Sequence, residues 1–207
     1  MMFSKLIAYQ LGHPSGLIGQ LILGPMWNRR NRALNDVTLD QLALRPDDRV
    51  LEVGFGGGYL LSRMSALVTA GGLAGVDVSP AMVNFCQTSQ RALIRAGRLE
   101  VKCAAAEALP YTAGCFTKVC SVNSIFYWSN VSQAMAEFWR VLTDDGTLVL
   151  TFTGRQSLQH RGFAQHGLNL LDVDQVQQMM AGPGFRDIHA IRASDKHRQF
   201  VCMIGRK

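Results

Sequence analysis

The feature that most constrains the fold of this 207-residue chain is a regular alternation of short apolar runs with longer amphipathic runs. The apolar runs are rich in strand-forming residues and occupy positions 50–53, 73–78, 99–103, 119–122, 146–152, 188–191 and 200–204. Helical patterns occupy positions 59–68, 80–97, 131–142 and 173–180. Strands that alternate with helices of this length form a parallel sheet covered on both faces, because right-handed crossovers place each helix over the sheet.

The chain is therefore predicted to be an α/β protein with a Rossmann-like, doubly wound, mostly parallel seven-stranded sheet. We expect an antiparallel C-terminal strand and an N-terminal helical cap. Ser79 and Pro80 fit the N-cap and first position of one helix, and Ser129 or Asn130 fits the cap of another. Because no linker divides the chain, we expect a cap or lid over residues 1–43 and one domain over residues 44–207.

Composition narrows the class of protein further. Hydrophobic residues make up 48% and charged residues 17% of the chain, which excludes a disordered or low-complexity protein. The net charge of +6 is compatible with acidic partners, but the basic residues are scattered, with Arg29, Arg30 and Arg32 as the longest cluster. We therefore expect no nucleic-acid partner. The five cysteines form no CxxC pair and do not combine with histidines at zinc-ligand spacing, which predicts no metal site and a cytoplasmic location.

Residues 6–28 contain no Lys, Arg, Asp or Glu. Pro14, Pro25 and several glycines interrupt this stretch, so it supplies neither a membrane span nor a clean signal-peptide core. Because the basic cluster follows directly, we keep peripheral contact of residues 6–28 with an anionic membrane as a hypothesis.

A glycine-rich turn follows the first predicted strand, where residues 52–59 read EVGFGGGY. Glycines there let the backbone turn sharply and let a ligand approach closely. A dinucleotide-binding turn places a third glycine at the position that Tyr59 occupies. The pattern here instead has Glu52 two positions before the first glycine, and this acid favours a cationic or zwitterionic ligand.

Asp77 ends the second predicted strand, nineteen residues beyond Gly58. A carboxylate at this place can accept hydrogen bonds from both hydroxyls of a ribose, beside the glycine turn. The alternative is that Asp77 caps the following helix, although Ser79 is already placed for that role.

With this glycine turn and Asp77, the sequence resembles the class I S-adenosylmethionine-dependent methyltransferases. It is most similar to the group that includes quinone-biosynthesis and many small-molecule methyltransferases. The resemblance rests on five motifs in the family's order, at residues 50–58, 75–82, 106–111, 116–128 and 137–146, and covers roughly residues 44–152.

The resemblance implies that S-adenosylmethionine is bound by residues from four of these motifs. They are Glu52, Gly54, Phe55, Gly56, Gly58, Asp77, Val78, Met82, Ala106, Glu107, Asn123 and Ser124. The family usually has Asp where this chain has Ala105, a loss that we expect to weaken adenine recognition by about 1 to 2 kcal/mol. Two other departures, Thr117 and the Asp144-Asp145-Gly146 turn, are expected to affect stability more than chemistry.

The implied reaction is in-line methyl transfer to a small, lipophilic acceptor. A base is needed only if the acceptor must lose a proton, and the sequence does not choose among acceptors. Candidate catalytic residues are Tyr127, His160 and His166, with Phe126, Trp128, Tyr9 and His13 as further candidates for the acceptor pocket.

Other functions stay open at this point. A nicotinamide-dependent oxidoreductase shares the fold but lacks its third glycine here. A nucleic-acid or protein methyltransferase is a second alternative, although residues 123–126 lack the Asn-Pro-Pro-Tyr motif that holds a flipped base. A binding protein that keeps the cofactor site without turnover is suggested only by Ala105.

Overall fold

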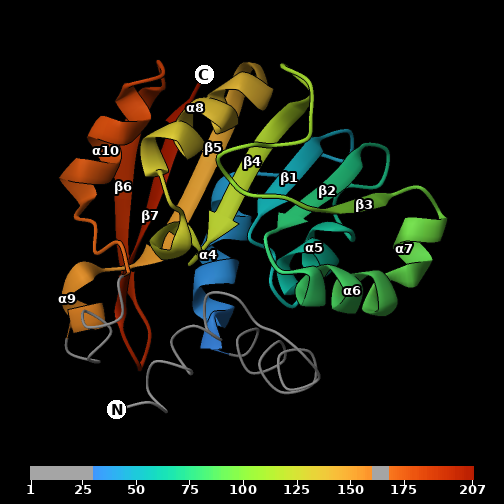
Figure 1. Ribbon diagram of the computed structural model, residues 1–207, viewed down its shortest axis with the longest axis horizontal. Coiled ribbons are helices and arrows are strands. Elements are labelled where there is room, and N and C mark those ends of the chain that lie inside the picture. Colours follow the sequence, from blue (N-terminus) through green and yellow to red (C-terminus); the bar gives the residue numbers. More distant parts are fainter. Residues whose placement is uncertain (1–29, 160–167) are drawn as a thin grey trace.

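The computed structural model describes residues 30–159 and 168–207, and the following account concerns these residues. Seven strands form one sheet in the order β3-β2-β1-β4-β5-β7-β6 (Figure 1). They are β1 (Arg49–Val53), β2 (Gly72–Asp77), β3 (Leu99–Cys103), β4 (Phe116–Val122), β5 (Leu142–Thr153), β6 (Arg186–Ser194) and β7 (Gln199–Arg206). All neighbours pair in parallel except β7, which is antiparallel to β5 and β6. The predicted fold is therefore confirmed.

Helices cover both faces of the sheet. One buried cluster joins α4 (Arg32–Leu42), α5 (Tyr59–Met64) and α6 (Pro80–Ser89) to the first face. The other joins α8 (Val131–Val141) and α10 (Val173–Ala181) to the second face, where Figure 1 shows them side by side. Three short helices, α7 (Arg91–Arg95), α9 (Arg155–Gln159) and η2 (Ile125–Tyr127), complete the set in the described residues. Burial of apolar side chains on both faces supplies the main stabilising term.

The structure confirms the cap predicted at Ser79 and decides between the two residues predicted for the other cap. The Ser79 hydroxyl accepts a hydrogen bond from the Met82 N–H at 3.4 Å, as predicted. Of the two candidates for the second cap, Asn130 is used, because its side-chain oxygen accepts from the Gln133 N–H at 3.1 Å. The pattern over residues 80–97 is not one helix, since non-helical backbone at Gln90 separates α6 from α7.

The two structural departures from the family pattern are accommodated locally. The Thr117 hydroxyl donates to the Asp48 carboxylate at 2.7 Å, a contact that an aspartate at position 117 would replace with repulsion. Asp145 has a φ of 61°, the left-handed conformation in which glycine is least strained.

The N-terminal region is described from residue 30 onward. Within it, α4 lies against the sheet: Leu34 and Leu42 are fully buried, and the Thr38 hydroxyl lies 2.7 Å from the Thr151 hydroxyl of β5. The division of the chain at residues 43 and 44 stays a prediction. The hypothesis for residues 6–28 and the candidates Tyr9, His13, His160 and His166 fall outside the described residues. Among the described helices, none has the length and apolar character needed to cross a bilayer.

Candidate active site

A cavity of about 410 Å³ lies at the carboxyl ends of the central strands. The strand order reverses beside β1, whose neighbours are β2 and β4. Ligands of doubly wound sheets bind at such a point, because the loops that follow adjacent strands diverge to opposite faces and leave a crevice. The cavity is lined by residues that follow β1, β2, β3, β4 and β5, together with the start of α4 and the turn before β7.

The glycine turn gives the cavity a wall of bare backbone. Gly54 has a φ of +76°, and a Cβ there would lie 2.6 Å from the Ser124 Cβ, so this position requires glycine. Gly56 has a φ of +50° and nothing within 4 Å of an added Cβ, so its backbone is open to a ligand. Gly58 instead caps α5 and packs toward Cys86 without lining the cavity. A cofactor contact at Gly58 stays a prediction.

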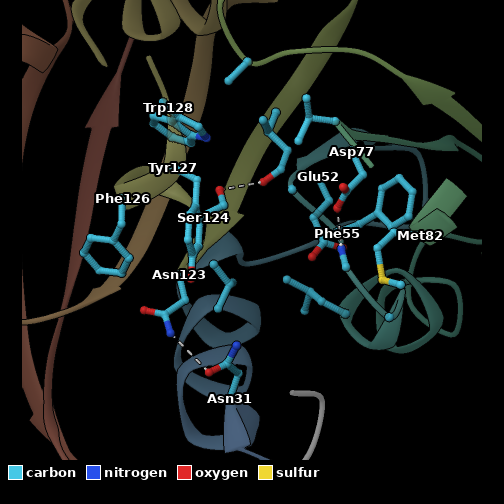
Figure 2. A pocket seen from close by; sticks show the side chains of 18 of the residues that line it. Asn31, Glu52, Phe55, Asp77, Met82, Asn123, Ser124, Phe126, Tyr127 and Trp128 are labelled. Atoms are coloured by element: carbon cyan, nitrogen blue, oxygen red, sulfur yellow. Dashed lines mark hydrogen bonds between the residues drawn. The ribbon is translucent and has the colours of Figure 1, made fainter. Parts of the chain in front are cut away.

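Asp77 ties the first two loops together. One carboxylate oxygen accepts from the Gly56 N–H and the other from the Ser79 N–H, each at 2.9 Å. The residue is 9% exposed and lines the cavity beside Met82, as Figure 2 shows. The carboxylate therefore shapes the turn and also faces the place where the sequence predicts a ribose. Val78, 44% exposed, lies at the same rim.

Glu52 is the most unusual charged group of the cavity. It is 3% exposed, and within the described structure its Oε2 atom has no hydrogen-bond partner. Burial, followed by the nearby charge of Asp77, raises its pKa to about 8. A carboxyl group in this state is suited to a cationic ligand, which would restore its charge and satisfy its free oxygen.

The segment after β3 contributes mainly small side chains. Ala105 and Ala106 line the cavity and place no carboxylate there. Glu107 lines it too, but its carboxylate accepts hydrogen bonds from the Ser129 hydroxyl at 2.8 Å and the Asn130 N–H at 3.0 Å. Burial would raise the pKa of Glu107, and these hydrogen bonds outweigh it and lower the pKa. Glu107 thus holds the loop before α8, and its predicted contact with adenine is untested.

Asn123 and Ser124 follow β4 at the centre of the cavity. Asn123 has a φ of 61°, and its side-chain oxygen accepts from the Thr153 N–H at 3.0 Å and the Thr153 hydroxyl at 2.9 Å. Its amide nitrogen donates to Asn31 at 3.3 Å (Figure 2). The Ser124 hydroxyl lies 2.6 Å from that of Ser121. Both residues line the cavity, and the Ser124 side chain lies beside the glycine turn at Gly54.

The aromatic run after β4 serves both packing and the cavity. Phe126 and Trp128 line the cavity, and they also make edge contacts with Phe152 and Phe138 in the core. Burial raises the pKa of Tyr127 to about 12, so its hydroxyl stays protonated at neutral pH. Tyr127 is thus a hydrogen-bond donor in the resting site and a poor base.

Sequence reasoning missed one side of the cavity. Residues from the start of α4, from the ends of β5 and from the turn before β7 line it, namely Arg30, Asn31, Asn35, Thr153 and Arg198. They come from distant parts of the chain and form no sequence motif. Only the position of Thr153 just after the fifth predicted strand could have indicated a role.

Comparisons with known proteins agree with this geometry. A family model described as "Methyltransferase domain" matches residues 51–150. An uncharacterized methyltransferase, YdaC, of Bacillus subtilis (strain 168) is 31% identical over 137 residues, which are 66% of this chain and 74% of YdaC. The chain belongs to the class I S-adenosylmethionine-dependent methyltransferases.

More distant relatives of this methyltransferase act on different compounds. A malonyl-[acyl-carrier protein] O-methyltransferase of Paenibacillus sp. (strain JDR-2) is 26% identical over 168 residues, covering 72% of this chain and 59% of that enzyme. Among solved structures, geranyl diphosphate C-methyltransferase from Streptomyces coelicolor A3(2), in complex with Mg²⁺, geranyl diphosphate and S-adenosyl-L-homocysteine, matches this chain with a TM-score of 0.73. It is 16% identical and covers 95% of this chain and 86% of its own, so it shows the fold alone.

The residues of this methyltransferase fit S-adenosylmethionine. Buried Glu52, whose Oε2 atom has no hydrogen-bond partner among the described residues, suits a molecule that carries ammonium and sulfonium groups. The open backbone at Gly56 leaves room for a close approach, and Asp77 presents a carboxylate at the rim. The described residues contain no cluster of side chains suited to a metal ion.

Proposed function

We propose that this protein transfers a methyl group from S-adenosylmethionine to a small acceptor bound in the same cavity. The observation that carries the proposal is the composition of one continuous cavity. Its walls after β1, β2, β3 and β4 come from the motifs of the family, whereas its walls at the start of α4, after β5 and before β7 come from residues outside those motifs. A cavity with both kinds of wall can hold two ligands side by side.

The bound donor supplies an electrophilic methyl group on a positively charged sulfur. Around it, the residues of the chain bind and orient. Asp77 is placed to hold ribose hydroxyls, and Glu52 opposes the positive charge. Asn123, fixed by two hydrogen bonds from Thr153, would orient the acceptor. Alignment of two reactants in one site supplies much of the rate of such a displacement.

The named relatives do not choose one acceptor. One is named for O-methyl transfer to a malonyl group on acyl-carrier protein, and another for C-methyl transfer to geranyl diphosphate. We propose a small, partly apolar acceptor, because Phe126, Leu158 and Leu168 line the cavity beside the polar groups. Kinship with the quinone-biosynthesis group is part of this proposal.

The proposal also includes a cellular location and a membrane contact. We place the enzyme in the cytoplasm, since all five cysteines are free thiols in the structure, as suits a reducing compartment. We also keep the hypothesis that residues 6–28 contact an anionic membrane. Co-sedimentation with anionic liposomes, before and after removal of residues 1–28, tests it, and equal binding by both forms would argue against it.

Calorimetry separates the proposed function from its main rival. Titration with S-adenosylhomocysteine should give a saturable binding signal, whereas NAD should give none, because Tyr59 replaces the third glycine of a dinucleotide turn. Tight binding of NAD with no binding of S-adenosylhomocysteine would overturn the proposal.

A transfer assay then tests the acceptor class. Tritiated S-adenosylmethionine is offered with phenols, quinones, thiols, amines and carboxylic acids, and in separate arms with nucleic acid and protein. We expect label in a small molecule. Label only in nucleic acid or protein would replace the small acceptor with a macromolecule.

A further inference from the structure

Three neighbouring strand ends form one side of the cavity. Glu52 lies near the end of β1, Asp77 ends β2, and residues 104–107 follow β3. Because β1, β2 and β3 are neighbours in the sheet, the backbones of these groups follow one another at the ordinary strand spacing of about 4.8 Å. Figure 2 shows Glu52, Asp77 and Met82 on the side of the cavity opposite Tyr127. A nucleoside that lies along this side extends from β1 toward β3.

This order assigns a place to the base of the methyl donor. In the proposed function, the charged sulfur opposes Glu52 at β1 and the ribose lies at Asp77. The sulfur-bearing carbon and the base are attached on different sides of the ribose ring, so a sulfur directed toward β1 directs the base toward β3. The surface there is apolar, because Val78 and Met82 line it together with residues 104–106, which are all alanines. Such a surface suits the flat face of a purine.

The alanines of this segment offer no hydrogen bond to the edge of a base. Ala104 and Ala105 are half-buried and Ala106 is buried, and all three line the cavity. The Ala105 carbonyl accepts from the Ala108 N–H at 3.2 Å, which closes a turn and engages one backbone acceptor. A methyl side chain packs against a purine but cannot accept a hydrogen bond from its 6-amino group.

Glu107, the carboxylate of this segment, is engaged by the protein itself. Its Oε1 atom accepts from the Ser129 hydroxyl at 2.8 Å and from the Asn130 N–H at 3.0 Å, and its backbone carbonyl accepts from the Gln133 side chain at 3.1 Å. These bonds tie Glu107 to the loop before α8 and to the start of that helix.

The other carboxylates of the cavity lie toward β1 and β2. Asp77 accepts from the N–H groups of Gly56 and Ser79, and Glu52 lies one strand further from β3. Residues 1–29 and 160–167 contain no Asp or Glu, so they add no carboxylate to this end. The part of the cavity after β3 therefore holds a base by packing.

Building on the proposed function, we infer that this enzyme selects its methyl donor without reading the 6-amino group of adenine. Its donors form a wider class, the purine S-nucleosides with or without an amino group at position 6 of the base. Ala105 is the residue that sets this breadth, because an aspartate at its position would add a charged acceptor to a wall that otherwise recognises the shape of the base.

Calorimetric titration with two matched ligands tests the inference. S-adenosylhomocysteine is compared with its 6-deamino analogue, in which hydrogen replaces the amino group and the ring nitrogen N1 remains an acceptor. We expect the two affinities to agree within about threefold, because an amino group that exchanges one water contact for another gains little on binding. A larger preference for S-adenosylhomocysteine would show that a group such as Glu107 reads the amino group, and it would overturn the inference.

A gain of selectivity in Ala105→Asp locates the effect. This variant should prefer S-adenosylhomocysteine over the analogue at least about tenfold, because the new carboxylate accepts a hydrogen bond from one ligand and gains none from the other. Ala113→Asp is the matched control, since Ala113 is exposed in the turn before β4 and does not line the cavity. A folded Ala105→Asp protein that still binds both ligands within threefold would contradict the assignment of Ala105.

The outcomes for the inference and for the proposed function are distinct. If Ala105→Asp fails to fold, the comparison of the two ligands on the wild-type protein still decides the inference. Neither titration requires the acceptor, so the result does not depend on which acceptor the enzyme uses. Failure of both ligands to bind the wild-type protein would instead refute the proposed function itself.

Discussion

The two ends of the active-site cavity are built in different ways. At the end that we call acidic, Glu52 and Asp77 lie near the carboxyl ends of the adjacent strands β1 and β2. Gly56 lies in the loop after β1, and its N–H donates to the Asp77 carboxylate. At the opposite end, which we call basic, Asn31, Asn123, Thr153 and Arg198 come from four distant segments and are joined mainly through side chains. The difference predicts that the fold itself fixes the acidic end, where we propose the cofactor, whereas single side-chain substitutions can remodel the basic end, where we propose the acceptor.

The largest effect is expected from Gly54→Ala, which changes the glycine turn at the acidic end. The added Cβ would lie 2.6 Å from the Ser124 Cβ at a φ of +76°. We expect affinity for S-adenosylhomocysteine to fall at least about a hundredfold, because the loop must move to relieve the clash. Gly97→Ala is the control, since Gly97 has a φ of +68° but nothing within 4 Å. Similar affinities of the two variants, measured by calorimetry, would show that the clash does not matter.

The second effect is a pH dependence that Glu52 confers. Its pKa of about 8 lies above the ordinary value of 4.5, so the folded, ligand-free protein holds a proton that the unfolded chain releases. The contribution of Glu52 to the free energy of unfolding is therefore largest below about pH 4.5 and falls as the pH rises toward 8. Binding of cationic S-adenosylmethionine should strengthen as Glu52 ionises around pH 8, on the order of twentyfold from pH 6.5 to 8.5.

Glu52→Gln should remove this pH dependence from both measurements. The matched control is Glu100→Gln, because Glu100 is exposed on β3. Chemical denaturation and calorimetry at several pH values provide the readouts. A wild-type affinity that is flat from pH 6.5 to 8.5 would show that Glu52 does not oppose the charge of the ligand.

Asp77→Asn removes the charge at the rim of the acidic end together with one of the two backbone hydrogen bonds that Asp77 accepts. The amide keeps an oxygen that can accept one backbone hydrogen bond but loses the charge, and we expect affinity for S-adenosylhomocysteine to fall about tenfold. Asp144→Asn, at an exposed position of β5, should bind like the wild type. Unchanged affinity of Asp77→Asn would count against the placement of the ribose.

The smallest effect is expected at the basic end. Thr153→Val removes the hydroxyl that links Asn123 to Arg198, and we expect the free energy of unfolding to fall by about 1 kcal/mol. Affinity for S-adenosylhomocysteine should stay within about twofold of the wild type, because Thr153 contacts no residue of the acidic end in these networks. Thr147→Val changes a threonine in the middle of the same strand that does not line the cavity, and it serves as the control. A large loss of cofactor affinity in Thr153→Val would show that the two ends are not separable.

The same contrast explains how much of the molecule the sequence could predict. The strands, the turn at Gly54 and the carboxylate at Asp77 follow from local patterns, because strand-to-helix loops use consecutive residues. Arg198 could not be found this way, since 167 residues separate it from Asn31 and no spacing rule connects them. Glu107 and Gly58 were assigned by motif position, but their visible contacts are a loop hydrogen bond and a packing contact.

The left-handed backbone at Asn123 has a consequence for the history of this enzyme. Few side chains tolerate a φ of 61°, and asparagine is among those that do. Its side chain also accepts two hydrogen bonds from Thr153 and donates one to Asn31. Aspartate lacks the donor, and glycine has no side chain to make any of these bonds. Homologues that retain asparagine at this place together with threonine after the fifth strand should therefore share a substrate preference, even where overall similarity is faint.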